Sequence, residues 1–417
     1  MVAAHDGAVP RAQLLSLKER ADGLLSHPGF SVVEKTRVPP SGDKHDFYAI
    51  GAYSWPNPAS RDGLPYIRRD GLYNPEAYSS TAYDKGRLRN FVDAVRTLSI
   101  AHILFSDRKY AVKVAQLLRK WFVDPQTSMN PNFRHAAAHP GVHDGRHSGV
   151  IEGAVFIELL DYVNCLNRNN SLSSELLSAL REWFAELSNW LVHHDFGRAE
   201  RYSTNNHGGY YLAQVMAFSS FAGLHRRARK VIPIAKSQIS WQISHDGRMP
   251  RELERPNALF YSIYALRAFS ALAKMAASYN EDLWLYKPPG RSAPAIPRAL
   301  LFLAPYLTGR KSWGGEKDTD EFGPYAAQLC RMAAFAYRSE LTFEMLRFVS
   351  SQPGVKASHE ALIGLDSPDG TAAGNALFRD LSLDDQPGLR DSGVARRVYR
   401  LITLLTRKKI IPSRSIA

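Results

Sequence analysis

The stretch NNHGGYYLAQVMAFSSFAGLHRRARKVIPIAKSQISWQI, residues 205–243, indicates the fold class of this chain. Apolar residues recur in it at intervals of three and four, which is the period of an amphipathic helix. Gly223 divides the stretch at a point where a glycine commonly follows the C-terminus of a helix. The β-branched pair Val231–Ile232 stands inside the same helical period, so it does not indicate a strand. The stretch therefore predicts two helices joined by a short turn, over 205–222 and 225–243.

Most of the remaining chain has the same helical period, and the alternation typical of strands is sparse and short. Ser174 precedes one helical run as a candidate N-cap, and Pro256 suits the first turn of another helix. The remaining helices are predicted over 10–25, 82–105, 107–122, 148–168, 172–194, 257–278, 294–306, 322–338, 341–350 and 392–407.

The number of helices and the length of their connections predict the architecture. Consecutive helices joined by short loops run antiparallel, and many such hairpins around one core build either a solenoid or a closed toroid. No fixed-period repeat is evident, which favours the toroid. We therefore predict an all-α chain in which residues 1–417 form a single (α/α) toroid domain, or barrel, of about six to seven helical hairpins, with the catalytic core at about 45–280.

Composition limits the class of protein and of partner. Of the 417 residues, 45% are hydrophobic and 22% are charged, which suffices for a large core and excludes disorder as the default. The formal net charge of +13 indicates an acidic partner, although charge alone leaves nucleic acid, an anionic membrane and an acidic polysaccharide open. No nucleic-acid-binding motif is recognised, and no run reaches the ~18 apolar residues needed to span a bilayer. We therefore predict neither a nucleic-acid nor a membrane partner.

Two further features concern the compartment. Cys165 and Cys330 are the only cysteines, too few for a disulfide framework, and buried free thiols are favoured over one bridge. The N-terminus lacks the uninterrupted apolar core of a signal peptide.

Two long irregular segments, 40–80 and 124–147, interrupt the helical pattern. Segments of this length in a compact domain are usually functional. Both have the composition of a sugar-binding groove, in which aromatic faces stack on pyranose rings and arginines bind carboxylates through forked contacts. The predicted substrate-binding residues, from these segments and from the two helix starts described next, are Trp55, Tyr66, Arg68, Arg69, Asn130, Arg146, Asn205 and Tyr264.

Four histidines in the second segment recur at every fourth position, namely His135, His139, His143 and His147. On a helix this spacing would make a metal-binding stripe. Pro140 and the nearby glycines break such a helix, so we favour a polar loop that contacts sugar and predict no metal site.

Two motifs carry candidate chemistry. The segment 205–210, NNHGGY, opens a helix, and the N-terminus of a helix attracts anions. Asn205 could equally be only the N-cap of this helix, and His207 could be a core histidine whose hydrogen bonds are made within the protein. About forty residues later Arg255 precedes Pro256, and Tyr261 lies roughly 9 Å further along the helix axis at ~1.5 Å per residue. Arg255 and Tyr261 can therefore face one cavity, although a surface arginine and a core aromatic would have the same spacing.

Four blocks of sequence together resemble the alginate lyase superfamily. They are YSWPNP with DGLPYIRRDG, TSMNPN with the downstream pair Gly145–Arg146, NNHGGYY, and DGRMPRELER followed by ALFY. The blocks occur in matching order over roughly residues 45–280, and four ordered blocks are far more specific than any one of them. The resemblance implies a periplasmic or secreted polysaccharide lyase that acts on an acidic polysaccharide and needs no cofactor.

One spacing departs from part of that superfamily. The periplasmic alginate lyases have an Asn–His pair and an arginine followed seven positions later by a tyrosine, whereas six positions separate Arg255 from Tyr261. The chain is therefore more similar to the broader relatives, which include β-glucuronan lyases and alginate lyases with a larger α/α barrel.

The resemblance implies that Asn206, His207, Arg255 and Tyr261 are the catalytic residues. Removing the C5 proton of a uronate adds charge beside an already negative carboxylate, which Arg255 and Asn206 would neutralise. Tyr261 would protonate the leaving O4 and, in a syn elimination, also abstract H5, its ionisation aided by Arg255 and His207. His207 would support Tyr261 or act as the base when H5 and O4 lie on opposite faces. Mannuronate and glucuronate share the C4/C5 geometry, so the implied substrate is polymannuronate or glucuronan.

Two other functions remain open from the sequence. An inverting glycoside hydrolase also occurs on α/α toroids and needs two carboxylates about 6.5 to 9.5 Å apart, for which Glu252, Asp46 and Glu152 are available. A non-catalytic protein that binds acidic polysaccharide is supported by the net charge and by aromatic residues interleaved with Arg68 and Arg69.

Overall fold

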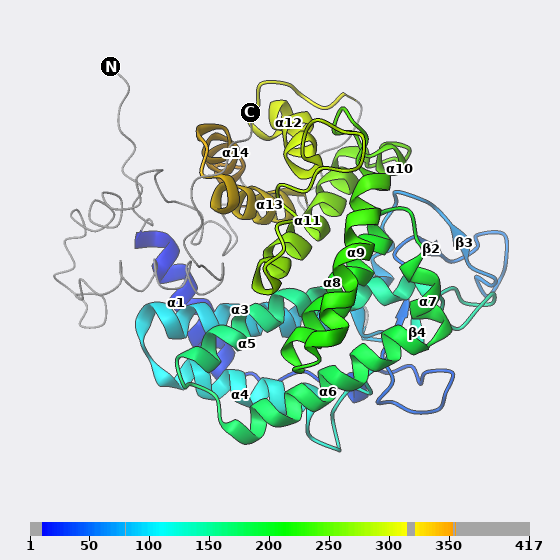
Figure 1. Cartoon of the computed structure of the whole chain (residues 1–417). Helices are drawn as coiled ribbons and strands as arrows, with labels where there is room; N and C mark the ends of the chain where they lie inside the picture. The colour runs from blue at the N-terminus through cyan, green and yellow to red at the C-terminus, as the bar shows by residue number, and fades with distance from the viewer. Residues whose placement is uncertain (1–10, 80, 315–321, 353–354, 356–417) are drawn as a thin grey trace.

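The computed structural model describes residues 11–79, 81–314, 322–352 and 355. Within them the chain forms fourteen α-helices, three 3₁₀ helices and four short strands, so the predicted all-α class is confirmed (Figure 1). The helix predicted over 392–407 lies outside the described residues. The longer helices are α1 (Arg11–Leu25), α3 (Lys85–Phe105), α4 (Arg108–Phe122), α5 (Val155–Arg168), α6 (Ser174–His193), α8 (Asn206–Phe221), α9 (His225–Gln242), α11 (Ala258–Ala276), α12 (Ala295–Leu307), α13 (Phe322–Tyr337) and α14 (Glu340–Ser350).

The short elements lie mostly between these helices, in the irregular parts of the chain. The short α-helices are α2 (Glu76–Ser79), α7 (Asp195–Arg201) and α10 (Pro250–Leu253). The 3₁₀ helices are η1 (Val32–Glu34), η2 (His147–Ala154) and η3 (Ala277–Tyr279). The strands are β1 (Tyr48–Ile50), β2 (Ser54–Trp55), β3 (Ile67–Arg68) and β4 (His135–Ala138).

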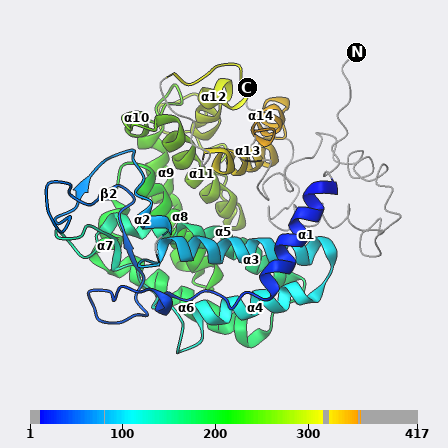
Figure 2. The same ribbon diagram turned by 180° about the vertical axis from the view of Figure 1, so that it is seen from behind.

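The long helices form an α/α toroid with an inner and an outer layer. Inner helices contact one another in chain order, α3 with α5, α5 with α8, α8 with α11 and α11 with α13. Outer helices follow them in the chain, and the pairs α3–α4, α8–α9 and α13–α14 are in contact. Connections of two to five residues leave room only for an antiparallel return, which is why neighbours in sequence pack as hairpins. Figure 2 shows the same arrangement from behind.

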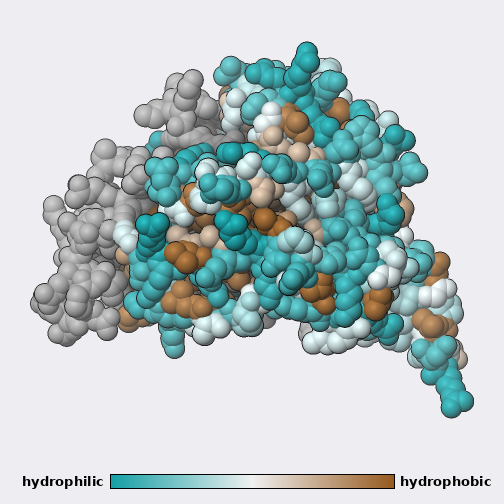
Figure 3. Space-filling view, turned by 90° about the horizontal axis from the view of Figure 1, so that it is seen from below, coloured by the Kyte–Doolittle hydropathy of each residue, from teal (hydrophilic) through white to brown (hydrophobic). Residues whose placement is uncertain are grey.

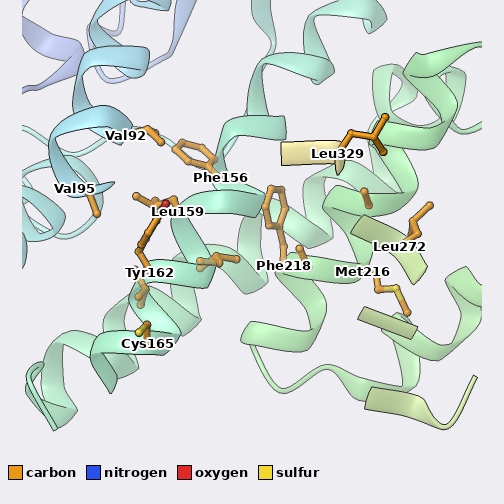
Figure 4. Packing of buried hydrophobic residues seen from close by; sticks show 14 of the residues in the cluster. Val92, Val95, Phe156, Leu159, Tyr162, Cys165, Met216, Phe218, Leu272 and Leu329 are labelled. Atoms are coloured by element: carbon orange, nitrogen blue, oxygen red, sulfur yellow. The ribbon is translucent and has the colours of Figure 1, made fainter. Parts of the chain in front are cut away.

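The hydrophobic core follows the inner helices. Figure 4 shows Val92 and Val95 of α3 in the same cluster as Phe156 of α5, Phe218 of α8 and Leu329 of α13. The helix α8 buries thirteen of its sixteen residues, because helices surround it on every side. A helix that is packed on every side is apolar on every face. The polar residues at the N-terminus of α8 are therefore not explained by contact with solvent.

Gly223 ends α8 in the way the sequence predicts. It has a φ of 79°, and its N–H donates to Ser220 while the N–H of Leu224 donates to Ser219. This is the Schellman arrangement, in which glycine carries the left-handed conformation at no steric cost. The turn sends the chain directly back along α8 as α9.

Three details of the predicted helices are wrong. Ser173 is the N-cap of α6, since its side chain accepts from the N–H of Leu176, and Ser174 is the first helical residue. Pro256 lies before the N-cap Asn257 of α11 instead of inside its first turn. The segment 147–154 forms the 3₁₀ helix η2, where an α-helix was expected, and its two glycines are poor α-helix formers.

The two long irregular segments lie against each other as one assembly. Strand β1 of the first pairs in parallel with β4 of the second, with Tyr48 opposite His135. Further backbone bonds run from Asn130 N to His45 O and from Tyr66 N to Pro140 O, both at 2.9 Å. These bonds hold the two segments to each other, and both segments contribute residues to the candidate site.

The surface and the cysteines complete the fold. The face in Figure 3 is mostly hydrophilic, and its hydrophobic residues form small separate groups. No helix in the described part of the chain is long and apolar enough to cross a membrane. Cys165 and Cys330 are both buried and free, as expected.

Candidate active site

The N-terminus of α8 brings the predicted Asn–His pair into the site. The side chain of Asn205 caps the helix by accepting from the N–H of His207 at 3.2 Å. A Cβ on Gly208 would lie 2.1 Å from the backbone oxygen of Ser203, so glycine lets the preceding turn close tightly onto the helix. Asn205 therefore has the capping role that the sequence allowed, and its cap fixes the positions of Asn206 and His207.

Asn206 is almost completely buried and is held by one carboxylate. Its backbone N–H donates to Glu252 Oε1 at 2.6 Å, and its side-chain Nδ2 donates to Glu252 Oε2 at 2.8 Å. Both residues are 1% exposed. Burial raises the pKa of Glu252 above its ordinary value, although the two bonds from Asn206 and the nearby Arg255 and His207 lower it. The expected donor of Asn206 is thus already paired in this structure.

A second buried carboxylate holds His207. Glu200 of α7 accepts from His207 Nδ1 at 3.1 Å through Oε2 and from His147 Nδ1 at 2.7 Å through Oε1. Burial raises the pKa of Glu200, but the two histidine bonds more than offset it, so the net pKa lies below the ordinary value. An ionised Glu200 fixes the Nδ1–H form of both rings and leaves Nε2 of each free for other contacts.

Tyr261 lies in the first turn of α11, where Arg255 and Tyr53 contact its hydroxyl and ring. Arg255 Nη2 donates to Tyr261 Oη at 3.0 Å, and its guanidinium carbon lies 3.9 Å from the ring centroid. The hydroxyl of Tyr53 makes a short hydrogen bond to the hydroxyl of Tyr261. Arg255 is in turn held by Asp70 through Nη2 at 3.0 Å and Nε at 3.3 Å. The predicted pairing of Arg255 with Tyr261 is therefore present, and Tyr53 and Asp70 complete it.

The protonation of this tyrosine pair follows from burial and from its neighbours. Burial raises the pKa of Tyr261 above 10, while the charge of Arg255 and the hydrogen bond from Tyr53 lower it. Burial also raises the pKa of Tyr53, and the neighbouring Tyr261 and Tyr73 raise it further. Of the two hydroxyls, Tyr261 is therefore the one whose anion has stabilising neighbours.

The predicted arginines surround the same region. Arg68 Nη2 pairs with Asp70 at 3.1 Å, next to Arg255. The guanidinium of Arg69 lies 5.5 Å from the ring centroid of Trp55, and the backbone N–H of Arg69 donates to the backbone oxygen of Tyr53. Burial and the nearby Arg68 lower the pKa of Arg146, whose Nε has no hydrogen-bond partner among the described residues. The arginines therefore gather positive charge beside the tyrosine pair.

Three predicted substrate-binding residues have their polar atoms or rings engaged by other groups. Asn130 Nδ2 donates to Asp43 and Asp46, both at 2.9 Å. The hydroxyl of Tyr66 donates to Glu76 at 2.9 Å. Tyr264 packs against Phe260, Tyr210 and Tyr325, with ring centroids 4.3 Å apart in the closest pair, Tyr210–Tyr264. Their contact with substrate stays a prediction.

Sequence reasoning missed four members of the site as described. Tyr53 and Asp70 lie inside the quoted blocks YSWPNP and DGLPYIRRDG, so the signal was present but was assigned to other residues of those blocks. Glu200 lies seven residues before His207 in a segment without a predicted helix. Glu252 was noted only as a carboxylate available to a hydrolase.

Within the residues that the structure describes, no cluster of three or more His, Cys, Asp or Glu side chains could hold a metal ion. Of the four spaced histidines, His135 lies on β4 and His147 begins η2. His139 and His143 lie in the loop between them, where His139 bonds to Ser54 Oγ at 2.7 Å and forms a bridge with His143. They do not form a helical stripe, as Pro140 led us to expect.

The arrangement combines two chemical capacities. A phenol with one cationic donor and one hydroxyl donor can release and return a proton, because both donors stabilise its anion. Beside it, the arginines offer positive charge and N–H groups to a ligand carboxylate. Proton exchange next to a bound anion is what the site can do.

Comparison with known proteins gives one family. The alginate lyase family model matches residues 31–313. The crystal structure of an alginate lyase from Bacteroides ovatus is 31% identical and has a TM-score of 0.73, covering 83% of this chain and 92% of that one. A histidine-to-alanine variant of alginate lyase A1-III, complexed with tetrasaccharide, is 16% identical with a TM-score of 0.52, covering 78% and 88%, and shows likeness of fold alone. Among curated proteins no match was found.

Proposed function

The chain belongs to the alginate lyase family, and on this premise we propose that it is a polysaccharide lyase that cleaves polymannuronate or glucuronan by β-elimination. The product would carry a 4,5-unsaturated uronate at the new non-reducing end. The observation that carries the proposal is the convergence of Arg255 and Tyr53 on the hydroxyl of Tyr261.

Tyr261 is assigned both proton transfers. As a phenolate it removes H5 from the uronate, and as the resulting phenol it gives that proton to the leaving O4. Its position in the first turn of α11 places the positive end of the helix dipole nearby, and this adds to the stabilisation of the anion by Arg255 and Tyr53. The two transfers need H5 and O4 on the same side of the sugar, as in mannuronate and glucuronate.

The charge that develops at the substrate carboxylate needs donors that are already in place. We assign this role to Asn206 and to the arginines beside it. Arg255 would donate both to the substrate carboxylate and to the hydroxyl of Tyr261. Asp70 keeps the Arg255 side chain extended across the tyrosine ring, since it binds two of the guanidinium nitrogens. Arg68, Arg69 and Arg146 would bind carboxylates of neighbouring sugar units. The tetrasaccharide bound by alginate lyase A1-III, which shares the fold, is consistent with a site for several units.

Glu200 binds Nδ1 of His207, and Nε2 has no hydrogen-bond partner among the described residues. This nitrogen would donate to the substrate carboxylate when the ring is charged. It could remove H5 from the opposite face when the ring is neutral, as a guluronate would require. Its fixed position makes it a poorer base for polyguluronate than Tyr261 is for polymannuronate. Action in the periplasm or outside the cell and a single domain stay predictions.

The contacts of the three candidate carboxylates argue against the hydrolase alternative. Glu252 is bonded twice to Asn206, Asp46 accepts from Asn130 and Asn132, and Glu152 pairs with Lys85 at 2.6 Å. An inverting hydrolase needs one free acid and one base that holds a water molecule. Each of these groups would first have to lose a close partner.

The experiment that tests the proposal follows the product. Purified protein is incubated with polymannuronate, polyguluronate, glucuronan and hyaluronan, while ultraviolet absorbance and new reducing ends are measured together. We expect both signals to rise in parallel with polymannuronate or glucuronan. Reducing ends without absorbance would indicate a hydrolase, and salt-sensitive binding without either signal would indicate a non-catalytic protein.

A further inference from the structure

The side chain of Asn206 has one polar atom with no partner. Its Nδ2 donates to Glu252 Oε2, but its Oδ1 is buried and accepts no hydrogen bond among the described residues. A buried amide usually has both ends satisfied, so this oxygen calls for an explanation. The two ends of an amide have nearly the same shape, and their assignment depends on what the neighbouring carboxyl donates or accepts.

The alternative orientation has a specific requirement. With the amide turned by half a rotation, Oδ1 faces Glu252 Oε2, and two acceptors meet unless Glu252 carries a proton. A protonated Glu252 donates from Oε2 to Asn206 Oδ1 and still accepts the backbone N–H of Asn206 at Oε1. The pair then makes two hydrogen bonds, and Nδ2 becomes the free end of the amide.

A bound uronate distinguishes the two orientations. This step rests on the proposed function, because it needs a substrate carboxylate beside Asn206. In the first orientation Asn206 would offer an oxygen to an anion, and the contact would be repulsive. In the second it offers an N–H, which is the group that the anion needs.

The surroundings of Glu252 favour its neutral form once substrate is bound. It is 1% exposed, and Asn206, Arg255 and His207 are the groups that act on it. A substrate carboxylate would occupy the same donors and bring a like charge close, and both effects favour a proton on Glu252. Glu200, on the other side of His207, differs because two histidines hold it ionised.

We propose that Glu252 is a positioning residue that becomes protonated when substrate binds and donates to Asn206 Oδ1, so that Asn206 Nδ2 faces the uronate carboxylate. In the complex Glu252 is thus neutral, whereas Glu200, the other buried glutamate beside α8, is charged.

Infrared difference spectroscopy tests the protonation directly. Tyr261→Phe protein, which should not turn over substrate, is measured with and without a mannuronate tetrasaccharide, whose binding is checked by calorimetry. We expect a neutral-carboxyl C=O band on binding that is absent in the Tyr261→Phe/Glu252→Gln protein. Binding without this band would overturn the inference alone. Absence of binding by mannuronate, guluronate and glucuronate oligosaccharides would overturn the proposed function, and the inference with it.

Kinetics provide the second arm. Glutamine at 252 is always neutral and can donate to Oδ1 while accepting the backbone N–H, so Glu252→Gln should lose about tenfold less kcat/KM than Glu252→Ala, which leaves Oδ1 without a donor. The matched control is Glu254→Gln, an exposed glutamate near the end of the same short helix that pairs only with Arg251 at 3.4 Å among the described contacts. A loss of more than about 100-fold in kcat for folded Glu252→Gln, with Glu254→Gln unaffected, would mean that the ionised carboxylate is needed.

Discussion

Tyr53→Phe removes one of the two hydrogen bonds at the Tyr261 hydroxyl and leaves the aromatic ring in place. Tyr53 lowers the pKa of Tyr261, so its loss disfavours the phenolate that removes H5. A hydrogen bond to a charged group contributes roughly 1.5 to 3 kcal/mol, and each 1.36 kcal/mol is a factor of ten in rate. We therefore expect kcat to fall about 10- to 150-fold, with a much smaller change in KM.

The pH dependence separates this effect from a general loss of structure. Without Tyr53 the pKa of Tyr261 moves upward, so the rise of kcat with pH should occur at higher pH than in wild type. The difference in kcat between Tyr53→Phe and wild type, large at neutral pH, should therefore become smaller as the pH rises. The assay is the initial rate of ultraviolet absorbance on polymannuronate or glucuronan between pH 6 and pH 10.

Tyr110→Phe is the matched control for this variant. Tyr110 is a buried tyrosine outside the site, and its hydroxyl donates to Asp22 at 2.8 Å at the contact of α4 with α1. Its removal should lower stability slightly and leave kcat unchanged. Wild-type kcat and an unchanged pH profile in Tyr53→Phe would refute the assignment of Tyr53 as a donor to the phenolate.

Three further predictions concern charge, acid stability and stereochemistry. Arg69→Ala should raise KM on a long polymer and weaken its salt dependence, with kcat little changed, and an unchanged KM would remove Arg69 from the substrate groove. Because the native pKa of Glu200 lies below its unfolded value of 4.5, its contribution to stability is complete above pH 4.5 and is lost as pH falls through the native pKa. Urea unfolding at pH 7 and pH 3.5 should thus depend less on pH in Glu200→Gln, and an identical dependence would contradict the ion pairing. Polymannuronate or glucuronan should be cut faster than polyguluronate of matched length, and the reverse order would mean that base and acid are different residues.

The helices could be predicted because their signals are local. The apolar period and the turn at Gly223 lie within one stretch. Both ends of α8 and the C-terminal end of α9 differ from the predicted bounds by one residue, and the start of α9 is as predicted. The short helices α7 and α10 could not be predicted, since a helix of seven or four residues shows too little of the period. Their positions matter, because they carry Glu200 and Glu252.

The site was predictable only where its partners are close in sequence or share a recognised block. Arg255 and Tyr261 are six residues apart, and their pairing follows from one helix start. Tyr53 bonds across 208 positions and Asp70 across 185, so these contacts depend on the folded toroid and on the sheet that joins the two loops. Asn206 was expected to be a free donor, but Glu252, 46 positions away, already binds it.

The central claim is that Tyr261 performs the proton transfers of an elimination. The most direct test compares wild type with Tyr261→Phe on polymannuronate and glucuronan, measuring binding by calorimetry and the 4,5-double bond by ultraviolet absorbance. We predict that wild type forms the double bond, and that Tyr261→Phe binds the polymer with similar affinity but forms none. Near-wild-type absorbance in Tyr261→Phe would contradict the account, because the proton would then be moved by another residue.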